Sequence, residues 1–376
     1  MLSILSFLLI LSVLVLLHEL GHYLVARAFG VRAYEFGFGF PPRAIGFVRE
    51  KGKWKIVTRK DETEYESTIW SLNWLPLGGF VRLKGESADD ASDKDSLTAK
   101  SGWKKFAVLA AGVSMNWLLA ATIFSFGFMI GVPAITNDLP ESAIVSNQHV
   151  EIVDVVADSA ASKAGIKPGD ALQSIDGVAV SNADNARIQL GTHTNLEETL
   201  ALGVMRDGQS LSIETKPAFL KELNRAGLGV ALSDIGTVRF PALLAIGEGI
   251  SQSVRFTGMI VSGFGTLIHD LVLGKGPSAD LSGPVGIAVM TGSIVEQGAW
   301  PVLQFMAVLS LNLAVINFLP IPALDGGRAL FVITEAIRRK KNNAKLEMLV
   351  NQWGMVGLLI LVALVTLNDI RRFFIH

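Results

Sequence analysis

Four long apolar segments constrain this chain more than any other feature of its sequence. They contain no charged side chain and cover residues 1–17, 106–132, 300–324 and 348–368. An α-helix needs ~20 mainly apolar residues to cross the core of a bilayer. Only 18% of the residues are charged, whereas soluble proteins average about 25%. These features exclude a disordered chain and an ordinary cytosolic enzyme. They predict a polytopic α-helical membrane protein with about four transmembrane helices.

Charge and cysteine content narrow the chemistry further. The net charge is −1, so no global field favours nucleic acid, and we expect no nucleic-acid partner. The chain has no cysteine and therefore has neither a disulfide nor a thiolate metal ligand. Any metal site must use His, Asp or Glu, and the chain has only six histidines.

Two of these histidines directly follow the first apolar segment, in the continuing predicted helix, in the pattern H-E-x-x-H. His18 and His22 are four residues apart, which places both imidazoles on one face of a helix, ~6 Å apart along its axis. Such a pair can bind one zinc ion, and Glu19 beside them can act as the catalytic base toward water. Ionisable groups in a membrane helix are costly unless they serve a site. The pattern therefore predicts a catalytic Zn²⁺ site.

A catalytic zinc site commonly has three protein ligands and one position for water. The other four histidines lie outside the predicted spans, so the third ligand should be a carboxylate. We expect Asp325, at the end of the third span, to fill this role. It can reach the histidines only if the first and third spans run in the same direction. Because the second span returns between them, residues 133–302 must then cross the membrane an even number of times, and a single span at 242–273 would put Asp325 on the wrong face. The apolar stretch 242–273 is therefore predicted to be an amphipathic helix on the membrane surface rather than a fifth span.

The distribution of basic residues indicates the orientation. Residues 24–105 hold many of the Lys and Arg side chains, and residues 338–341 read Arg-Arg-Lys-Lys. Cytoplasmic loops carry an excess of these residues. We therefore expect both segments in the cytoplasm, and both termini and the long region 133–302 outside.

Two regions outside the spans have β character. Residues 34–85 alternate short apolar runs with Gly and Pro, which predicts a small membrane-associated sheet. An exposed strand near 79–84 could hold an extended substrate by β-addition, or the hairpin could be purely structural. Residues 86–101 are polar and acidic and predict a flexible loop. Residues 140–218 contain strand-like alternation and Gly-containing turns, which predict a soluble module.

H-E-L-G-H in the first span and N-x-x-P-x-P-x-L-D-G-G in a later one resemble the site-2 protease family of intramembrane zinc metalloproteases. Within it, the sequence is most similar to the bacterial regulator of sigma-E protease branch. The resemblance covers nearly the whole chain, including residues 37–39, 76–81, 112–116 and 281–286. It implies a multi-pass protease of the bacterial inner membrane that uses Zn²⁺ and has its active site near the cytoplasmic side.

The resemblance also implies roles for residues around the third ligand. Asn312 and Asn317 would help to hold the substrate, and Pro320 and Pro322, also assigned to substrate binding, would distort the ligand-bearing helix. One departure from the family pattern is Val113, which stands where proline is frequent.

Within 140–218, the order S-A-A-x-x-A-G-x-x-P-G-D-x-L-x-x-I-D-G resembles a PDZ domain of bacterial proteases. The resemblance implies a periplasmic filter over the active site, or a spacer without a ligand. One such module is present, where the enterobacterial type has two. The predicted division is transmembrane helix 1–26 with H-E-x-x-H, cytoplasmic-side β region and loop 27–105, transmembrane helix 106–132, PDZ domain 140–218, post-PDZ and interfacial segment 219–302, transmembrane helix 303–327 with the ligand Asp, and transmembrane helix 353–371.

The implied partners are membrane lipid and single-span membrane proteins, such as an anti-sigma factor already trimmed by another protease, or remnant signal peptides. A PDZ-bound peptide is a further candidate. The alternative function is a catalytically inactive PDZ-bearing membrane adaptor with a structural metal site. Glu19 argues against it, because a structural site needs no base. A transporter is a third hypothesis, disfavoured because no inverted repeat is visible.

Overall fold

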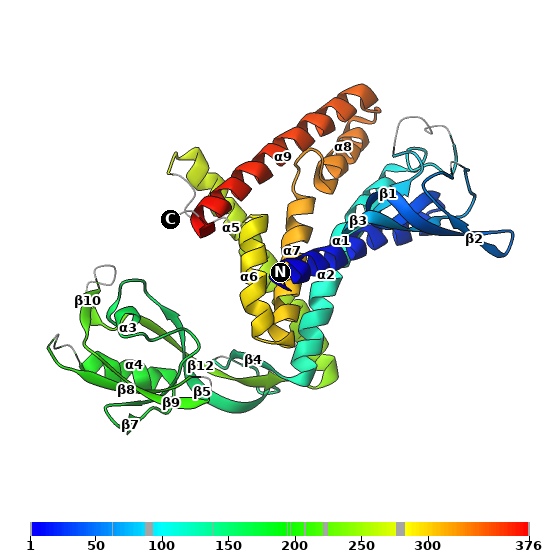
Figure 1. The fold of residues 1–376 in the computed structure, drawn as a ribbon. Helices are drawn as coiled ribbons and strands as arrows, with labels where there is room; N and C mark the ends of the chain where they lie inside the picture. Colours follow the sequence, from blue (N-terminus) through cyan, green and yellow to red (C-terminus); the bar gives the residue numbers. More distant parts are fainter. Residues whose placement is uncertain are drawn as a thin grey trace. The chain divides into compact units, whose positions relative to one another are not determined.

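The chain forms two compact units in a computed structural model (Figure 1). One unit comprises Met1–Phe124 and Glu248–His376, and the other comprises Ser125–Gly247. The structure describes residues 2–61, 63–86, 93–137, 139–193, 195, 197–206, 208–220, 225–275 and 283–374.

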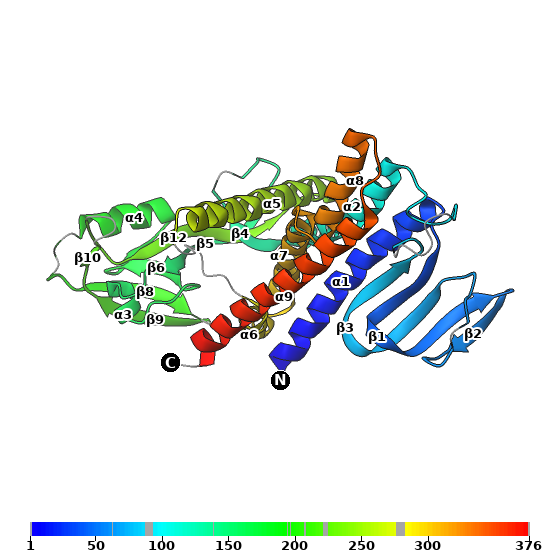
Figure 2. The ribbon, with the colours of Figure 1, turned by 90° about the horizontal axis from the view of Figure 1, so that it is seen from above.

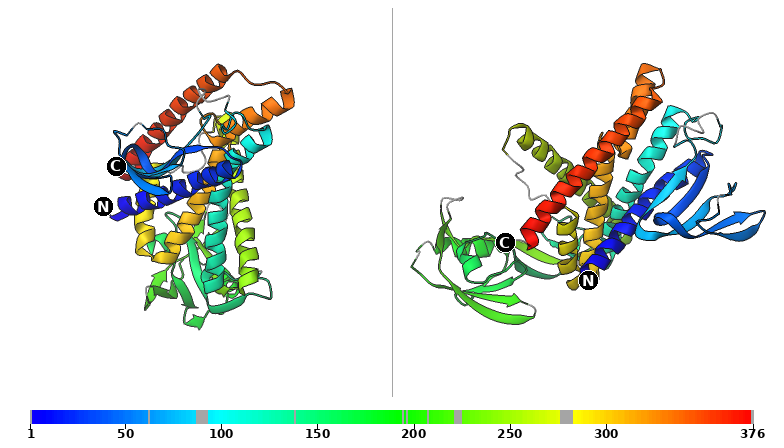
Figure 3. Two further views of the ribbon diagram at one scale, coloured as in Figure 1. Left: turned by 90° about the vertical axis from the view of Figure 1, so that its right-hand side faces the viewer. Right: turned by 45° about the horizontal axis from the view of Figure 1, so that its top comes forward.

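The first unit is mainly helical, and four of its helices are long and apolar enough to cross a membrane. The helices are α1 (Leu2–Ala28), α2 (Gly102–Ile130), α5 (Ala242–Val272), α6 (Pro284–Glu296), α7 (Ala299–Phe318), α8 (Asp325–Arg338) and α9 (Ala344–Phe374). The four candidate spans lie in α1, α2, α7 and α9, the four segments predicted from the sequence. Helix α6 packs against α1, α7 and α9 (Figure 3).

The predicted helix over 242–273 is present as α5, whose ends match closely. It is not among the four candidate spans, and Glu248, Arg255, His269 and Asp270 lie along one face of it. Its location at the membrane surface stays a prediction. Many of its apolar side chains are exposed, including Leu243, Ile250 and Val254.

A three-stranded sheet follows α1 and consists of β1 (Ala33–Glu50), β2 (Lys53–Val57) and β3 (Ile69–Leu83), in the order β2-β1-β3. Both β1 and β3 are long and irregular, so Glu35 pairs with Ile69 and also with Arg82. The first part of β1 therefore lies between two stretches of β3. The last stretch of β3, 79–83, pairs with β1 and has no further strand beside it among the described residues. It lies along α1 (Figure 2).

The third predicted span is shorter than 303–327, and this is a correction. Helix α7 ends at Phe318, and Asp325 is the first residue of a separate helix, α8. Proline has no N–H to donate and forces the residue before it toward an extended conformation, so Pro320 ends the helix at Leu319, where ψ is 144°. Helix α8 then turns back tightly, since a Cβ on Gly326 would lie 2.3 Å from the Phe318 carbonyl oxygen.

The second unit is a β-rich module that extends beyond the predicted 140–218. Strands β4 (Val132–Ile135) and β12 (Val230–Arg239) lie outside that range, yet β12 pairs with β4 on one side and with β5 on the other. Strand β12 follows a stretch that carries no PDZ-like pattern, so its place in the sheet was not predicted. The remaining elements are β5 (Ile144–Val155), α3 (Ala160–Lys163), β6 (Ala171–Ile175), β7 (Val178–Ala179), α4 (Ala183–Thr192), β8 (Leu200–Arg206), β9 (Gln209–Thr215), β10 (Ala218–Leu220) and β11 (Arg225–Gly227).

The core of this module is apolar, with one buried ion pair at its edge. Ile152, Ile175 and Leu202 belong to a cluster of buried side chains contributed by several strands. Asp170 is 1% exposed and accepts two hydrogen bonds of 2.6 Å from Arg206. The turn that precedes β6 is therefore fixed to β8 by a paired charge.

Candidate metal centre

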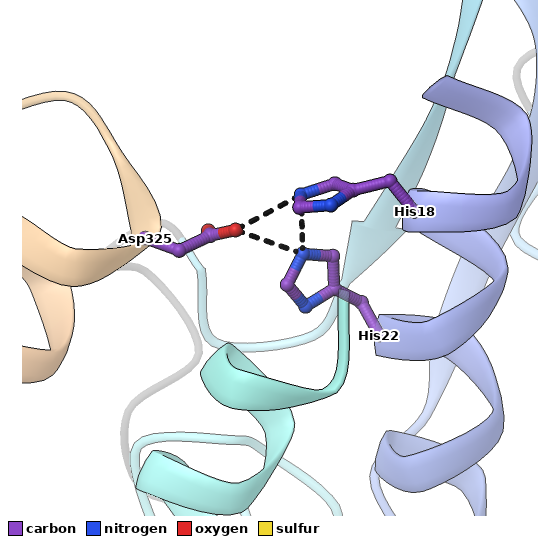
Figure 4. A group of neighbouring side chains, drawn as sticks. All are labelled: His18, His22 and Asp325. Carbon is purple, nitrogen blue, oxygen red and sulfur yellow. Dashed lines mark hydrogen bonds and ion pairs between the residues drawn. The ribbon is translucent and has the colours of Figure 1, made fainter. Parts of the chain in front are cut away.

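Three side chains predicted as metal ligands converge in the first unit (Figure 4). His18 and His22 stand on successive turns of α1, with their Nε2 atoms 3.2 Å apart. Asp325 Oδ2, from the start of α8, lies 3.0 Å from His18 Nε2 and 3.2 Å from His22 Nε2. Both histidines are buried, and no other group of three potential ligands occurs in the part of the chain that the structure describes.

The geometry of these atoms fits zinc. Zn–N distances of 2.0–2.1 Å in a tetrahedral site place neighbouring ligand atoms about 3.3 Å apart. The three separations between the Nε2 and Oδ2 atoms, 3.0 to 3.2 Å, are close to that edge length. Two imidazoles and one carboxylate also leave a fourth position open, as in catalytic zinc sites.

Helix α2 forms the wall behind the two imidazoles. The Val108 carbonyl oxygen lies 2.8 Å from His22 Nδ1, and Asn116 Nδ2 lies 3.3 Å from His18 Nδ1. Gly112 lies between them, and a Cβ there would be 2.4 Å from His22 Nε2. The three α2 residues are spaced by four and therefore share a face. Residues 112–116 are part of the family resemblance, but the sequence indicates no role for Gly112 or Asn116.

The predicted base, Glu19, faces strand β3. Its Oε2 accepts a 3.1 Å hydrogen bond from the Val81 N–H. One and two turns earlier, α1 contacts the same stretch: Leu16 packs on Gly79, and Ser12 Oγ accepts from the Gly78 N–H at 3.2 Å. Strand β3 therefore runs beside the part of α1 that carries the ligands.

The other predicted site residues lie at different distances from the ligands. Asn317 Nδ2 is 3.5 Å from His18 Nε2. Asn312 instead donates to the Val308 carbonyl oxygen one turn earlier in α7. Pro320 and Pro322 lie in the link between α7 and α8, where Pro322 packs closely against Gly354 of α9.

One ion pair that the sequence did not predict connects the ligand-bearing helix α8 to the turn after β3. Arg328, one turn after Asp325, donates from Nη1 to Glu86 Oε1 at 2.7 Å. The N–H of Leu83, the last residue of β3, points to the other oxygen of Glu86 at 3.4 Å. Strand β3 is thus linked to α1 through Glu19 and to α8 through Arg328. No sequence spacing could reveal this contact, because the two partners are 242 residues apart.

Comparison with known proteins identifies relatives over nearly the full length. Residues 6–361 match peptidase family M50. Several relatives bear the name "putative zinc metalloprotease". The one from Agrobacterium fabrum is 32% identical and covers 98% of this chain and 95% of its own, and the one from Clostridium perfringens is 35% identical and covers 96% of each. The regulator of sigma-W protease RasP of Bacillus subtilis is 29% identical over 99% of both chains.

Among solved structures, the PDZ domain of an SdrC-like protein from Listeria monocytogenes matches 24% of this chain and 92% of its own, with 19% identity and a TM-score of 0.21.

Proposed function

The chain belongs to peptidase family M50 and is an intramembrane zinc metalloprotease, and we propose that His18, His22 and Asp325 hold its zinc. The convergence of their three ligand atoms carries this proposal, since His18 and Asp325 are 307 residues apart in sequence. Two buried histidines and a carboxylate at these separations have the donor set and the spacing that zinc prefers.

Each residue of the site then has a distinct task. Bound zinc would supply a Lewis acid that polarises the scissile carbonyl and makes a water more acidic. Glu19 takes the proton from the attacking water and delivers it to the leaving amine. Its hydrogen bond to the Val81 N–H fixes the carboxylate beside the ligands without making it one of them.

The last stretch of β3 is the proposed binding surface for an unwound substrate. Peptide bonds in a helix are shielded, and at membrane depth an unwound backbone must find hydrogen-bond partners in the protein. A strand with one unpaired side can supply them by β-addition. Residues 79–83 have one side without a further strand, and because the Val81 and Leu83 N–H groups donate to Glu19 and Glu86, the substrate would bond the remaining backbone groups of that side. Asn317, close to His18, would bond the substrate backbone near the cut. Asn312 would do so one turn or more away.

We place both termini and the β-rich module outside the cytoplasm, on the basis of the basic residues at 24–105 and 338–341. The module is proposed to be a PDZ domain that limits which substrates reach the site. The expected substrates are single-span proteins, such as a trimmed anti-sigma factor, or remnant signal peptides. The name of the Bacillus subtilis relative, a regulator of sigma-W protease, supports the first of these.

Metal content tests the proposed ligands. Protein purified in detergent should contain one zinc per chain, and His18→Ala, His22→Ala and Asp325→Ala should each lose it. The matched control is His269→Ala, because His269 is an exposed histidine on α5. Full zinc content in the three ligand variants would refute the assignment. Loss of zinc in the His269→Ala variant would also count against it.

A further inference from the structure

Each predicted histidine ligand presents its two ring nitrogens to different neighbours. The Nε2 atoms face Asp325, and the Nδ1 atoms face α2. An imidazole that binds a metal through Nε2 has a lone pair there and must carry its proton on Nδ1. That Nδ1–H needs an acceptor, which also fixes the ring orientation.

For His22 the acceptor is evident. The Val108 carbonyl oxygen lies 2.8 Å from Nδ1, so it can accept the proton directly. A helical carbonyl retains a second lone pair after its bond to the N–H four residues later, which here belongs to Gly112. Backbone geometry alone therefore sets the tautomer of His22.

For His18 the corresponding partner is the side chain of Asn116, two turns farther along the same face of α2. Asn116 is fully buried at 0% exposure. Its Nδ2 lies 3.3 Å from His18 Nδ1, and its Oδ1 has no hydrogen-bond partner among the described residues. A half-turn of the carboxamide exchanges its two ends in nearly the same space and brings Oδ1 to His18 Nδ1.

We propose that Asn116 is a positioning residue of the metal centre, whose Oδ1 accepts the His18 Nδ1–H and thereby commits His18 Nε2 to zinc. This inference rests on the proposed ligand set. The backbone carbonyl oxygen of Asn116 accepts a 2.8 Å hydrogen bond from Ser310 of α7, which is separate from the side-chain contact with His18. Asn116 touches neither the substrate nor the reacting atoms, and it acts through His18.

The opposite carboxamide orientation makes a different prediction. If Nδ2 donates to His18 Nδ1, the ring proton moves to Nε2, where it points at Asp325 Oδ2, 3.0 Å away, and blocks coordination. Substitutions that keep only an acceptor or remove both polar groups distinguish these arrangements.

Zinc affinity, measured by competition with a chelator on the detergent-purified full chain, tests the proposal. Asn116→Leu removes the acceptor at similar volume and should weaken zinc binding by about 10–100-fold, the usual effect of losing such a partner. Asn116→Asp keeps an acceptor in place and should bind at least as tightly as wild type. If the leucine variant does not fold, Asn116→Ala replaces it with the same expected loss. Thermal melting of the zinc-free proteins establishes folding.

Two further variants make the result specific. Ser310→Ala removes a buried hydrogen bond to the same residue without touching an imidazole, so it should leave zinc affinity unchanged. His18→Ala tests the ligand set itself and should lose zinc altogether. Wild-type affinity in Asn116→Leu, or equal weakening in Asn116→Asp and Asn116→Leu, would overturn the role of Asn116. If His18→Ala kept its zinc, the ligand assignment would fail instead.

Discussion

Gly112 shows at the scale of a single residue how closely α2 approaches the proposed ligands. An added Cβ would lie 2.4 Å from His22 Nε2 and 2.8 Å from His18 Nε2, much closer than any real Cβ contact. The two imidazoles lie against helix backbone here because the position has no side chain. The sequence shows a glycine in an apolar span, which by itself does not distinguish this contact from ordinary helix packing.

Gly112→Ala should therefore disable the metal centre. Displacing an imidazole by about 1 Å can cost ~100-fold in rate, so we expect at least that loss of peptidase activity together with substoichiometric zinc. Gly258→Ala in α5 is the matched control, because nothing lies within 4 Å of its added Cβ. Its activity and zinc content should match wild type. Normal zinc content in Gly112→Ala would contradict the close approach of α2.

At the scale of elements, apolar length and periodicity predicted most of the helices and strands. The four spans appear where the uncharged segments predicted them, and a helix is present over the apolar stretch at 242–272. The break between α7 and α8 was missed because apolar residues continue through Pro320 and Pro322, so hydropathy does not change at the helix end. Strand β12 was missed for a different reason: it pairs with β4 and β5, which are distant from it in sequence.

The ion pair between Asp170 and Arg206 should make the β-rich module sensitive to acid. Burial alone would raise the pKa of Asp170, but hydrogen bonds from Arg206 and the Lys167 N–H outweigh it, so this pKa lies below its ordinary value of 3.8. A lowered pKa stabilises the fold fully above the ordinary value. The stabilisation is lost as the pH falls through the lowered value.

We expect Arg206→Gln to destabilise the module by about 3 kcal/mol at neutral pH, because it leaves a buried carboxylate without its partner. Amide hydrogen exchange in β6 and β8 of the full chain measures this change. Asp184→Asn is the control, since its ion pair with Arg187 is exposed and contributes little. Unchanged protection of β6 and β8 in Arg206→Gln would show that the pair does not hold the module together.

At the scale of the whole molecule, the number of membrane crossings between the ligand-bearing spans decides whether the proposed ligands can meet. His18 and His22 come late in the first span, and Asp325 follows the third. The two spans must therefore cross the membrane in the same direction for the ligands to meet. The structure brings the three predicted ligands together, and their role as zinc ligands stays a proposal. The sequence could not predict the α2 wall or the contact between Glu86 and Arg328, because both depend on packing between distant segments.

The absence of cysteine makes the proposed orientation directly testable. Single substitutions Ser101→Cys, before α2, and Ser210→Cys, in β9, introduce exposed thiols in the proposed cytoplasmic and outside regions. A membrane-impermeant maleimide should label the first only in inverted vesicles and the second only in right-side-out vesicles. The unsubstituted chain is the control and should not be labelled. The reverse pattern would invert the assigned topology.

Cleavage of a single-span substrate by the purified protein tests the central claim most directly. Wild type should cut the substrate within or beside its membrane span, and Glu19→Gln should reduce the rate by orders of magnitude while keeping one zinc per chain, because the proposed base is not a ligand. A zinc chelator should abolish the wild-type activity. Equal cleavage by Glu19→Gln and wild type would contradict the assignment of Glu19 as the base and of this centre as the peptidase site.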